Sequence, residues 1–274
     1  MVKCHTETLR FKKSDRLFLE RLTFYVEVFL ASHFPSPAYQ KKSLGRNHGF
    51  ADEKQGNLFF DVADIIATHR PRAFFLENVK NLVSHDRGNT FSVIRNTLTD
   101  LGYSFDYHVF NGKHFVPQNR ARTFMIGFDK SQYGTDIRFN LAQIALPSPT
   151  HQLKDLLQIK ADDKYTLSDK LWQFLQNYAA KHQSKGNGFG YGLVDPEGIS
   201  RTLSARYYKD GSEILIPQHG KNPRRLTPRE CAALQGYPQH FRIPVSDTQA
   251  YRQFGNSVVM PLIQAIGQYL IEIL

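Results

Sequence analysis

The chain has 274 residues, enough for one large domain or two small ones, and its 41% hydrophobic and 22% charged residues exclude a disordered protein. Its 35 Lys and Arg outnumber 25 Asp and Glu, and the formal charge of +10 favours a nucleic-acid partner, although a ribosomal protein or a merely basic enzyme fits the same charge. The two cysteines, Cys4 and Cys231, exclude a disulfide framework and a zinc site built from cysteines.

The cellular setting is predicted from features that the sequence lacks. No stretch approaches the run of about 18 apolar residues that a membrane-spanning helix needs, and the first residues have no apolar signal-peptide core. The 11 histidines show no metal-ligand spacing, so we expect no metal site. We therefore expect a soluble, cytoplasmic protein without a membrane partner.

The first predicted elements are a helix and a buried strand. Apolar residues recur at helical spacing over residues 57–69, and Pro71 marks the break into the next element. Residues 73–76 form a continuous apolar run that ends in Glu77 and Asn78. This pattern is typical of a central parallel strand that carries polar groups at its C-terminal edge, where α/β sheets place their chemistry.

A second helix and two further strands are predicted next. Apolar spacing over residues 91–101 predicts a helix closed by Gly102, and β-type runs follow at 103–110 and 122–128. The order is therefore β-α-β-β. Beyond Asp129 the periodicity weakens, and we expect a less regular domain to follow.

Two helices are predicted in the C-terminal part. Thr227, Pro228 and Glu230 form the N-terminal signature of a short helix that ends at Gly236, and Cys231 lies on its core side. Residues 261–274 have apolar side chains at helical spacing, and we expect this helix to pack on the first domain.

Four separated segments resemble motifs of the DNA (cytosine-5) methyltransferases, in the order and spacing of that family. They are LENVKNL at 76–82, PQNRAR at 117–122, RRLTPRECAALQGYP at 224–238 and QFGNSV at 253–258. The resemblance covers residues 43–274. Within the family, the segments SLGRNHGF, GNGFGYGLV and RTLSARYYKDGSEILI most resemble bacterial enzymes that act at the inner cytosine of CCWGG or CCNGG sites.

The resemblance implies an α/β fold: a truncated Rossmann-like sheet of the S-adenosylmethionine-dependent methyltransferases, with a small irregular target-recognition domain. Residues 43–129 plus 249–274 would form a partial catalytic domain. Residues 130–248 would form the region that recognises double-stranded DNA, and residues 1–42 would be non-homologous.

Catalytic roles are implied for three residues. The family adds a cysteine thiolate to carbon-6 of a flipped-out cytosine, and an acid holds and protonates the pyrimidine edge. Glu77 matches this acid, and Asn78 would fix the strand end. Arg120 and Arg122 resemble the pair that positions the base oxygen, the nucleophile loop and a phosphate. Without the motifs, a strand end that caps a neighbouring helix would be the better explanation of Glu77 and Asn78, and Arg120 and Arg122 could be solvated charges on an edge strand.

Cofactor and DNA contacts are implied further along the chain. Residues Asn256, Ser257 and Val258 resemble the loop that closes over the methionine part of S-adenosylmethionine, although Gly255-Asn256 also fits a simple turn. The glycine-rich segment 186–192 is interpreted as a DNA-facing loop rather than a phosphate-binding loop, because no apolar strand precedes it. Interleaved basic and aromatic residues favour DNA contact over a solvated strand face at Arg201, Arg206, Tyr207, Tyr208 and Lys209.

The family's Pro-Cys nucleophile and Gly-rich cofactor turn are absent from this sequence. However, residues 28–42 can be back-translated with permitted codons so that a frame one nucleotide earlier reads GFPCQPFSIAGVSKK, the nucleophile loop of the family. The missing cysteine would lie across the codons of Leu30 and Ala31. We therefore interpret residues 1–42 as out-of-frame translation that joins the family sequence at a poly-adenine run.

This chain is therefore expected to be inactive alone, although its family methylates DNA. Two alternatives remain open at this point. The chain could be one subunit of a split methyltransferase that a second, N-terminal polypeptide completes, or a non-catalytic, sequence-specific DNA-binding protein.

Overall fold

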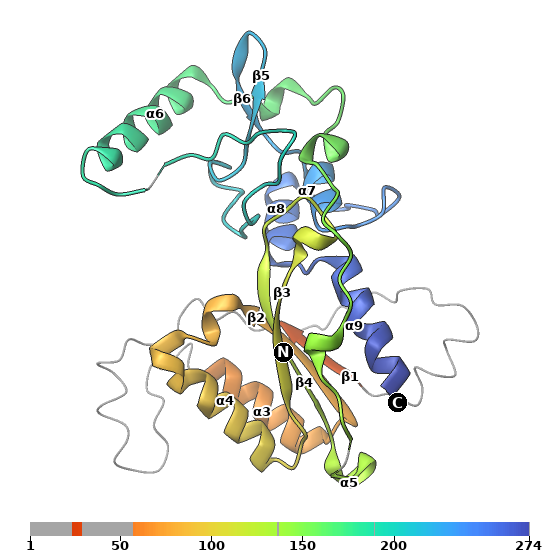
Figure 1. The fold of residues 1–274 in the computed structure, drawn as a ribbon. Helices are drawn as coiled ribbons and strands as arrows, with labels where there is room; N and C mark the ends of the chain where they lie inside the picture. Colours follow the sequence, from red (N-terminus) through yellow and green to blue (C-terminus); the bar gives the residue numbers. More distant parts are fainter. Residues whose placement is uncertain (1–23, 29–56, 136, 189, 274) are drawn as a thin grey trace. The chain divides into compact units, whose positions relative to one another are not determined.

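The computed structural model describes residues 24–28, 57–135, 137–188 and 190–273 (Figure 1). The chain divides into two compact units, the first with residues 1–110 and 122–142, and the second with residues 111–121 and 143–274. The sequence resemblance assigns residues 249–274, by their family role, to the same domain as residues 43–129. By their contacts, residues 249–274 belong to the second compact unit. The role-based division stays a prediction.

The first unit contains a four-stranded sheet with the order β1-β2-β4-β3. Strand β2 (Ala73–Val79) lies inside the sheet, parallel to β1 (Phe24–Val28) and antiparallel to β4 (Ala121–Phe128), and β3 (Asp106–Asn111) borders β4. The predicted strand at 73–76 is confirmed as part of β2. Only one of the two neighbours of β2 is parallel to it, because β4 enters the sheet from the opposite end.

Two helices cover one face of this sheet, α3 (Asn57–His69) and α4 (Asn89–Asp100) (Figure 1). Both match the predicted spans closely, and Gly102 follows α4 with a φ of +85°, a conformation that favours glycine. A short helix, α5 (Lys130–Tyr133), follows β4. The buried side chains that join α3 and α4 to the sheet are Phe59, Val62, Ile66, Phe74, Leu76, Ile94, Leu98 and Met125.

The alternation of side chains along β2 decides which face carries polar groups. Phe74 and Leu76 belong to the core under α3 and α4. Because successive side chains of a strand point to opposite faces, Phe75 and Glu77 project from the other face of the sheet. Phe75 packs there against Phe124 of β4, with 5.6 Å between ring centroids.

Tyr103 provides a pH-dependent contribution to the stability of the first unit. Its hydroxyl donates a hydrogen bond to the Pro71 carbonyl at 2.7 Å, and burial raises its pKa to about 12, against the opposing charge of Arg70. The folded state therefore favours the neutral phenol, and the stabilisation present below pH 10 is lost as the pH rises from about 10 to about 12.

We expect wild type to lose on the order of 1–2 kcal/mol relative to Tyr103→Phe across this range. Urea unfolding of both proteins at several pH values checks this expectation. Equal pH dependence in the two proteins would contradict it.

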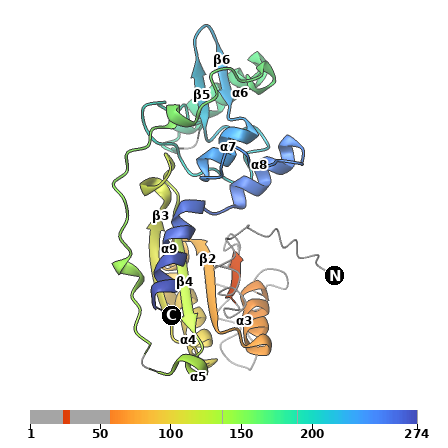
Figure 2. The same cartoon turned by 90° about the vertical axis from the view of Figure 1, so that its right-hand side faces the viewer.

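The second unit holds a two-stranded hairpin and four helices (Figure 2). The hairpin strands β5 (Leu215–Gln218) and β6 (Lys221–Arg225) are antiparallel. The helices are α6 (Asp169–Gln183), α7 (Pro228–Leu234), α8 (Asp247–Asn256) and α9 (Met260–Ile273). Short 3-10 turns occur in both parts of the chain, at Lys80–Leu82, His85–Gly88, Gly112–His114, Leu141–Gln143, Leu153–Leu156 and Asp163–Tyr165.

Helix α7 begins and ends as its sequence predicts. Thr227 caps the helix, Glu230 returns a hydrogen bond to the Thr227 backbone, and Pro228 occupies the first turn. Gly236 follows with a φ of +79°, and a Cβ there would meet the Pro261 ring at 2.4 Å. The predicted tail helix is α9. Within the described part of the chain, no helix is long and apolar enough to cross a membrane.

Candidate functional site

A carboxylate lies near the end of an interior strand of the first unit. Glu77 is the fifth residue of β2 and is only 6% exposed. The next residue, Asn78, is buried, and its Oδ1 accepts a hydrogen bond from the Val79 backbone N–H at 2.8 Å. This bond joins the Asn78 side chain to the next backbone group of β2, and the predicted role of Asn78 in fixing the strand end stays a prediction.

Arg122 pairs with this carboxylate from the neighbouring strand. In the antiparallel register Glu77 lies opposite Phe124 and Val79 lies opposite Arg122, so Glu77 and Arg122 are diagonal neighbours on one face. The Arg122 Nε lies 3.0 Å from Glu77 Oε1, and the side chains are 16% and 8% exposed. The two residues were predicted separately from two motifs, and the sheet register brings them together.

The charges of this pair depend on each other. Burial lowers the pKa of the Arg122 guanidinium, and the Glu77 carboxylate acts in the opposite direction. Arginine remains a cation in either case. A buried, partly desolvated ion pair interacts more strongly than an exposed one, and it holds both side chains in fixed orientations. The arrangement presents a carboxyl group and a guanidinium edge side by side.

Arg120 belongs to the second unit and makes different contacts. It is 3% exposed, and its guanidinium donates to the carbonyls of Leu203 at 2.8 Å, Gly255 at 3.0 Å and Ser257 at 2.6 Å. Through these bonds Arg120 joins the C-terminal end of α8 to Leu203, about fifty residues earlier. The contacts support a positioning role for Arg120, and its predicted contact with a base or phosphate stays a prediction.

The sequence interpretation assigned no role to Gln118, two residues earlier. Its side chain is fully buried, donates to the Leu234 carbonyl at 2.9 Å and accepts from the Leu203 N–H at 2.9 Å. Gln118 and Arg120 thus bind the two backbone groups of Leu203. A polar amide between Pro117 and Asn119 was the only sequence signal, and an amide in a polar segment does not by itself indicate burial.

The predicted cofactor loop begins at the last residue of α8, Asn256. Asn256 is exposed, and Ser257 and Val258 are half-buried. The polar groups of Ser257 already have partners: its hydroxyl lies 2.8 Å from the Tyr237 hydroxyl, its N–H donates to Phe254, and its carbonyl accepts from Arg120. These three contacts hold Ser257 in place, and the predicted role of residues 256–258 toward a cofactor stays a prediction.

The residues predicted to contact DNA divide into exposed and buried groups. Arg201, Arg206 and Lys209 are exposed, in an irregular segment rather than on a strand. Tyr207 is a correction: its side chain is fully buried, its hydroxyl donates to the Ile214 carbonyl at 2.7 Å, and burial raises its pKa well above the usual value. The half-buried Tyr208 carries the Arg252 guanidinium 4.3 Å above its ring.

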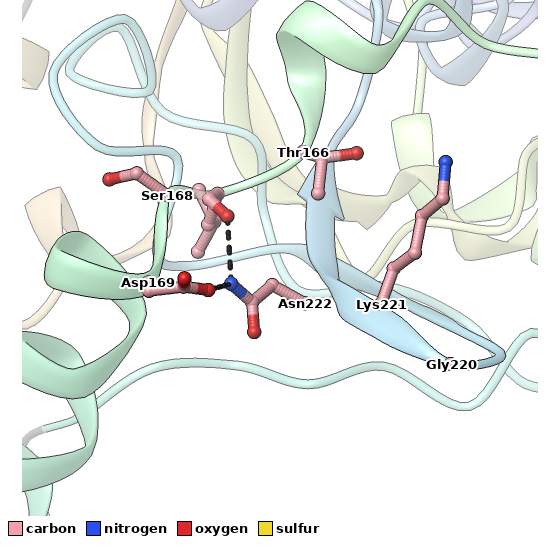
Figure 3. A pocket seen from close by; sticks show the side chains of 7 residues that line it. Thr166, Ser168, Asp169, Gly220, Lys221 and Asn222 are labelled. Carbon is pink, nitrogen blue, oxygen red and sulfur yellow. Dashed lines mark hydrogen bonds between the residues drawn. The ribbon is translucent and has the colours of Figure 1, made fainter.

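A polar hollow of about 660 Å³ lies beside the hairpin, and Figure 3 shows its lining. Asn222 donates to the Leu167 carbonyl and to Asp169 Oδ1, at 3.1 and 2.6 Å, and Lys221 pairs with Asp163 at 2.8 Å. The Asn222 bonds hold β6 against the start of α6, and the Lys221 pair joins the hairpin to the turn Asp163–Tyr165. The polar groups of the hollow therefore serve the local structure.

Comparison with known proteins identifies the family. The C-5 cytosine-specific DNA methylase family matches residues 37–272 of this chain. The Type II methyltransferase M.SsoII of Shigella sonnei is 49% identical over 250 residues, which cover 89% of this chain and 64% of that protein. The chain belongs to the C-5 cytosine-specific DNA methylase family. The match begins at residue 37, slightly before the predicted start at 43.

A further relative and a solved structure are also similar to this chain. The DNA-cytosine methyltransferase of Escherichia coli K12 is 48% identical over 267 residues, which cover 84% of this chain and 56% of that protein. The crystal structure of S. pombe Dnmt2 methyltransferase matches with a TM-score of 0.65 at 15% identity, over 91% of this chain and 77% of that one. The predicted α/β methyltransferase fold is confirmed. The chain spans about 56–64% of the length of these two curated relatives.

The methylase chemistry needs a thiolate and S-adenosylmethionine, and the described residues provide neither site in full. Cys231 is fully buried on the core side of α7, as predicted, and burial raises the pKa of its thiol well above the usual value, so Cys231 is not a nucleophile. Cys4 and residues 29–56 lie outside the described residues. S-adenosylmethionine supplies the methyl group in this family, and the predicted contact of residues 256–258 with it stays a prediction.

Proposed function

We propose that this chain carries the base-holding and DNA-reading parts of a cytosine-5 DNA methyltransferase of the restriction-modification or orphan type. The Glu77–Arg122 pair supports this proposal most directly, because the family chemistry needs an acid and a guanidinium at one sheet edge. The target is the inner cytosine of CCWGG or CCNGG. This finer assignment rests on the resemblance of the segments SLGRNHGF, GNGFGYGLV and RTLSARYYKDGSEILI.

In this proposal Glu77 acts on the edge of a flipped-out cytosine. Addition of a thiolate at carbon-6 moves electron density into the ring, and a proton held at the ring nitrogen absorbs it. Glu77 shares that proton and accepts a hydrogen bond from the exocyclic amine. Arg122 keeps the carboxyl group in place and directs its guanidinium to the base oxygen. Exposed Arg201, Arg206 and Lys209 contact the DNA.

We also propose that the 274-residue chain does not methylate DNA alone. Its two cysteines are Cys4, which no proline precedes, and the buried Cys231. No other side chain replaces a thiolate under carbon-6. The out-of-frame interpretation of residues 1–42 supplies a reason, and sequencing the gene and its upstream DNA tests it. An upstream region without a methyltransferase reading in either neighbouring frame would contradict it.

The test of this proposal is bisulfite sequencing of duplex DNA incubated with the purified chain and S-adenosylmethionine. We expect complete conversion of the inner cytosine of CCWGG and CCNGG sites. A matched reaction with an active Type II methyltransferase shows that protected cytosines are detectable. Any conversion-resistant inner cytosine produced by this chain would overturn the proposed inactivity.

Two alternative functions predict different results in activity and binding experiments. If a second polypeptide supplies the nucleophile and the cofactor strands, an adjacent reading frame ends in the FPCQ motif and only the mixture is active. If the chain is a non-catalytic DNA-binding protein, it binds CCWGG-like duplexes more tightly than unrelated ones. Affinity that is salt-sensitive but independent of sequence would count against this second alternative.

A further inference from the structure

The outer face of α6 carries an unusual mixture of exposed rings and cations. We define the α6 stripe as Lys170, Phe174, Tyr178, Lys181 and Lys185, all of which are exposed. Their spacing of three or four residues places them on one face of the helix and its C-terminal extension. Phe174 is 60% exposed and Tyr178 is 42% exposed, although most large apolar side chains of this unit are buried or half-buried.

Packing on the inner face fixes the direction of the stripe. Leu175 is buried, and Leu171 and Trp172 pack with it in one cluster that includes Leu215 of β5. The Trp172 ring contacts the Tyr191 ring with 4.7 Å between centroids. The start of α6 lies beside β6, and Figure 1 shows the rest of the helix leading away from the hairpin. This cluster occupies the neighbouring face of α6, and the side chains of the stripe stay exposed.

The lysines of the stripe differ from other lysines of the same unit. Three lysines form ion pairs there, Lys154 with Glu197, Lys164 with Asp247 and Lys221 with Asp163. Among the described residues, no ion pair involves a lysine of the α6 stripe. Their positive charges are available to an external anion, in a chain whose formal charge is +10.

The aromatic rings of the stripe lie next to one another along α6, between the lysines. Phe174 and Tyr178 are stacked with an interplanar angle of 27° and 6.1 Å between centroids, and the His182 ring follows 4.3 Å from Tyr178. Exposed rings in a row indicate a contact surface. Rings interleaved with unpaired cations match the sugars and phosphates of a nucleic acid better than the apolar face of a protein.

We propose that the α6 stripe binds the sugar–phosphate backbone of duplex DNA that flanks the methylation target. This inference rests on the proposed DNA substrate and adds a surface that contributes affinity without sequence preference. Lysine ammonium groups act as point charges on phosphates, and such contacts position a protein without reading bases. The 15 residues of α6 extend over about 22 Å, the length of several base pairs.

The test replaces the three lysines together, Lys170→Gln, Lys181→Gln and Lys185→Gln, in the 274-residue chain. Fluorescence anisotropy measures Kd for duplexes with and without a central CCWGG site between about 50 and about 200 mM salt. We expect about tenfold to hundredfold weaker binding to both duplexes, an unchanged ratio between them, and a salt slope smaller by about 2.7. Shortening the duplex DNA on either side of the CCWGG site should weaken binding of wild type but not of the variant.

The matched control replaces the ion-paired lysines, Lys154→Gln, Lys164→Gln and Lys221→Gln, which removes the same charge from the same unit. We expect this variant to bind within about threefold of wild type, because those charges are already neutralised. Equal losses in both variants, or wild-type binding by the stripe variant, would overturn the inference.

The same measurements separate this inference from the proposed function. Wild type that binds both duplexes equally, with the stripe variant weaker on both, refutes the proposed target sequence and supports the stripe. Wild type that prefers CCWGG, with a stripe variant of unchanged affinity, refutes the stripe and leaves the proposed function standing. Phe174→Ser tests the rings separately, and weaker binding to both duplexes is expected. Circular dichroism confirms that each variant is folded.

Discussion

Glu77→Gln is expected to lower the methylation rate of a reconstituted enzyme by about 10²- to 10⁴-fold. Reconstitution joins the N-terminal part of M.SsoII, which is 49% identical to this chain, to residues 43–274. The glutamine side chain has the size of the glutamate side chain and keeps one oxygen that accepts hydrogen bonds. It cannot hold the proton that the Glu77 carboxyl group shares with the cytosine ring. The loss should therefore appear in kcat, measured by transfer of a labelled methyl group to duplex DNA.

Asp61→Asn is the matched control, because it makes the same chemical change at an exposed carboxylate of α3 in the same unit. Its rate should equal that of the reconstituted parent. Thermal unfolding of both variants separates a catalytic loss from a folding defect around Arg122. A Glu77→Gln enzyme within about threefold of the parent rate would exclude Glu77 as the acid. An inactive reconstituted parent would contradict the proposal that residues 43–274 keep their catalytic parts.

The second large effect concerns the stability of the second unit. Glu230 is 1% exposed and accepts hydrogen bonds from both terminal nitrogens of Arg224, at 2.8 and 2.9 Å. The same carboxylate accepts from the backbone N–H groups of Thr227 and Gln158, each at 2.8 Å. Glu230→Ala removes all four bonds and leaves the Arg224 cation buried without its counter-charge. We expect a loss of about 3–5 kcal/mol in the free energy of unfolding.

Urea unfolding monitored by circular dichroism measures this loss. Glu197→Ala is the control, because Glu197 pairs with Lys154 at the surface, where the side chains are 60% and 47% exposed. Such exposed pairs contribute about 0–1 kcal/mol, so the control should unfold almost as wild type does. A loss below about 1 kcal/mol for Glu230→Ala would show that the buried network contributes little net stability.

Local signals in the sequence predicted the secondary structure well. The span of α3, the end of α4 at Gly102 and the start of α7 at Thr227 all follow from residues within one or two turns. The predicted strand at 103–110 starts later, at Asp106. Tyr103 instead forms an isolated bridge with Asp129 and buries its ring in the core, a choice that depends on a partner distant in sequence.

The site residues show the same difference between local signals and contacts that are distant in sequence. The motif chemistry identified Glu77 and Arg122, and the sheet register pairs them. The sequence interpretation placed Tyr207 with the DNA-contacting residues because a basic, aromatic segment surrounds it. Its ring packs in a core cluster with Leu226 and Tyr251, and the Leu226 backbone N–H donates to its hydroxyl at 2.7 Å; no pattern within 201–209 contains that information.

The sequence by itself determined the family, the helix ends and the acid at the end of a strand, because each depends on residue types at short, fixed spacing. Only the tertiary structure decided which polar side chains are buried and which atoms they bind. Arg120 shows the reason: its partners Leu203 and Ser257 lie 83 and 137 residues further along the chain. A side chain is buried by the residues that pack around it. Because these residues are distant in sequence, a local sequence pattern cannot indicate the burial.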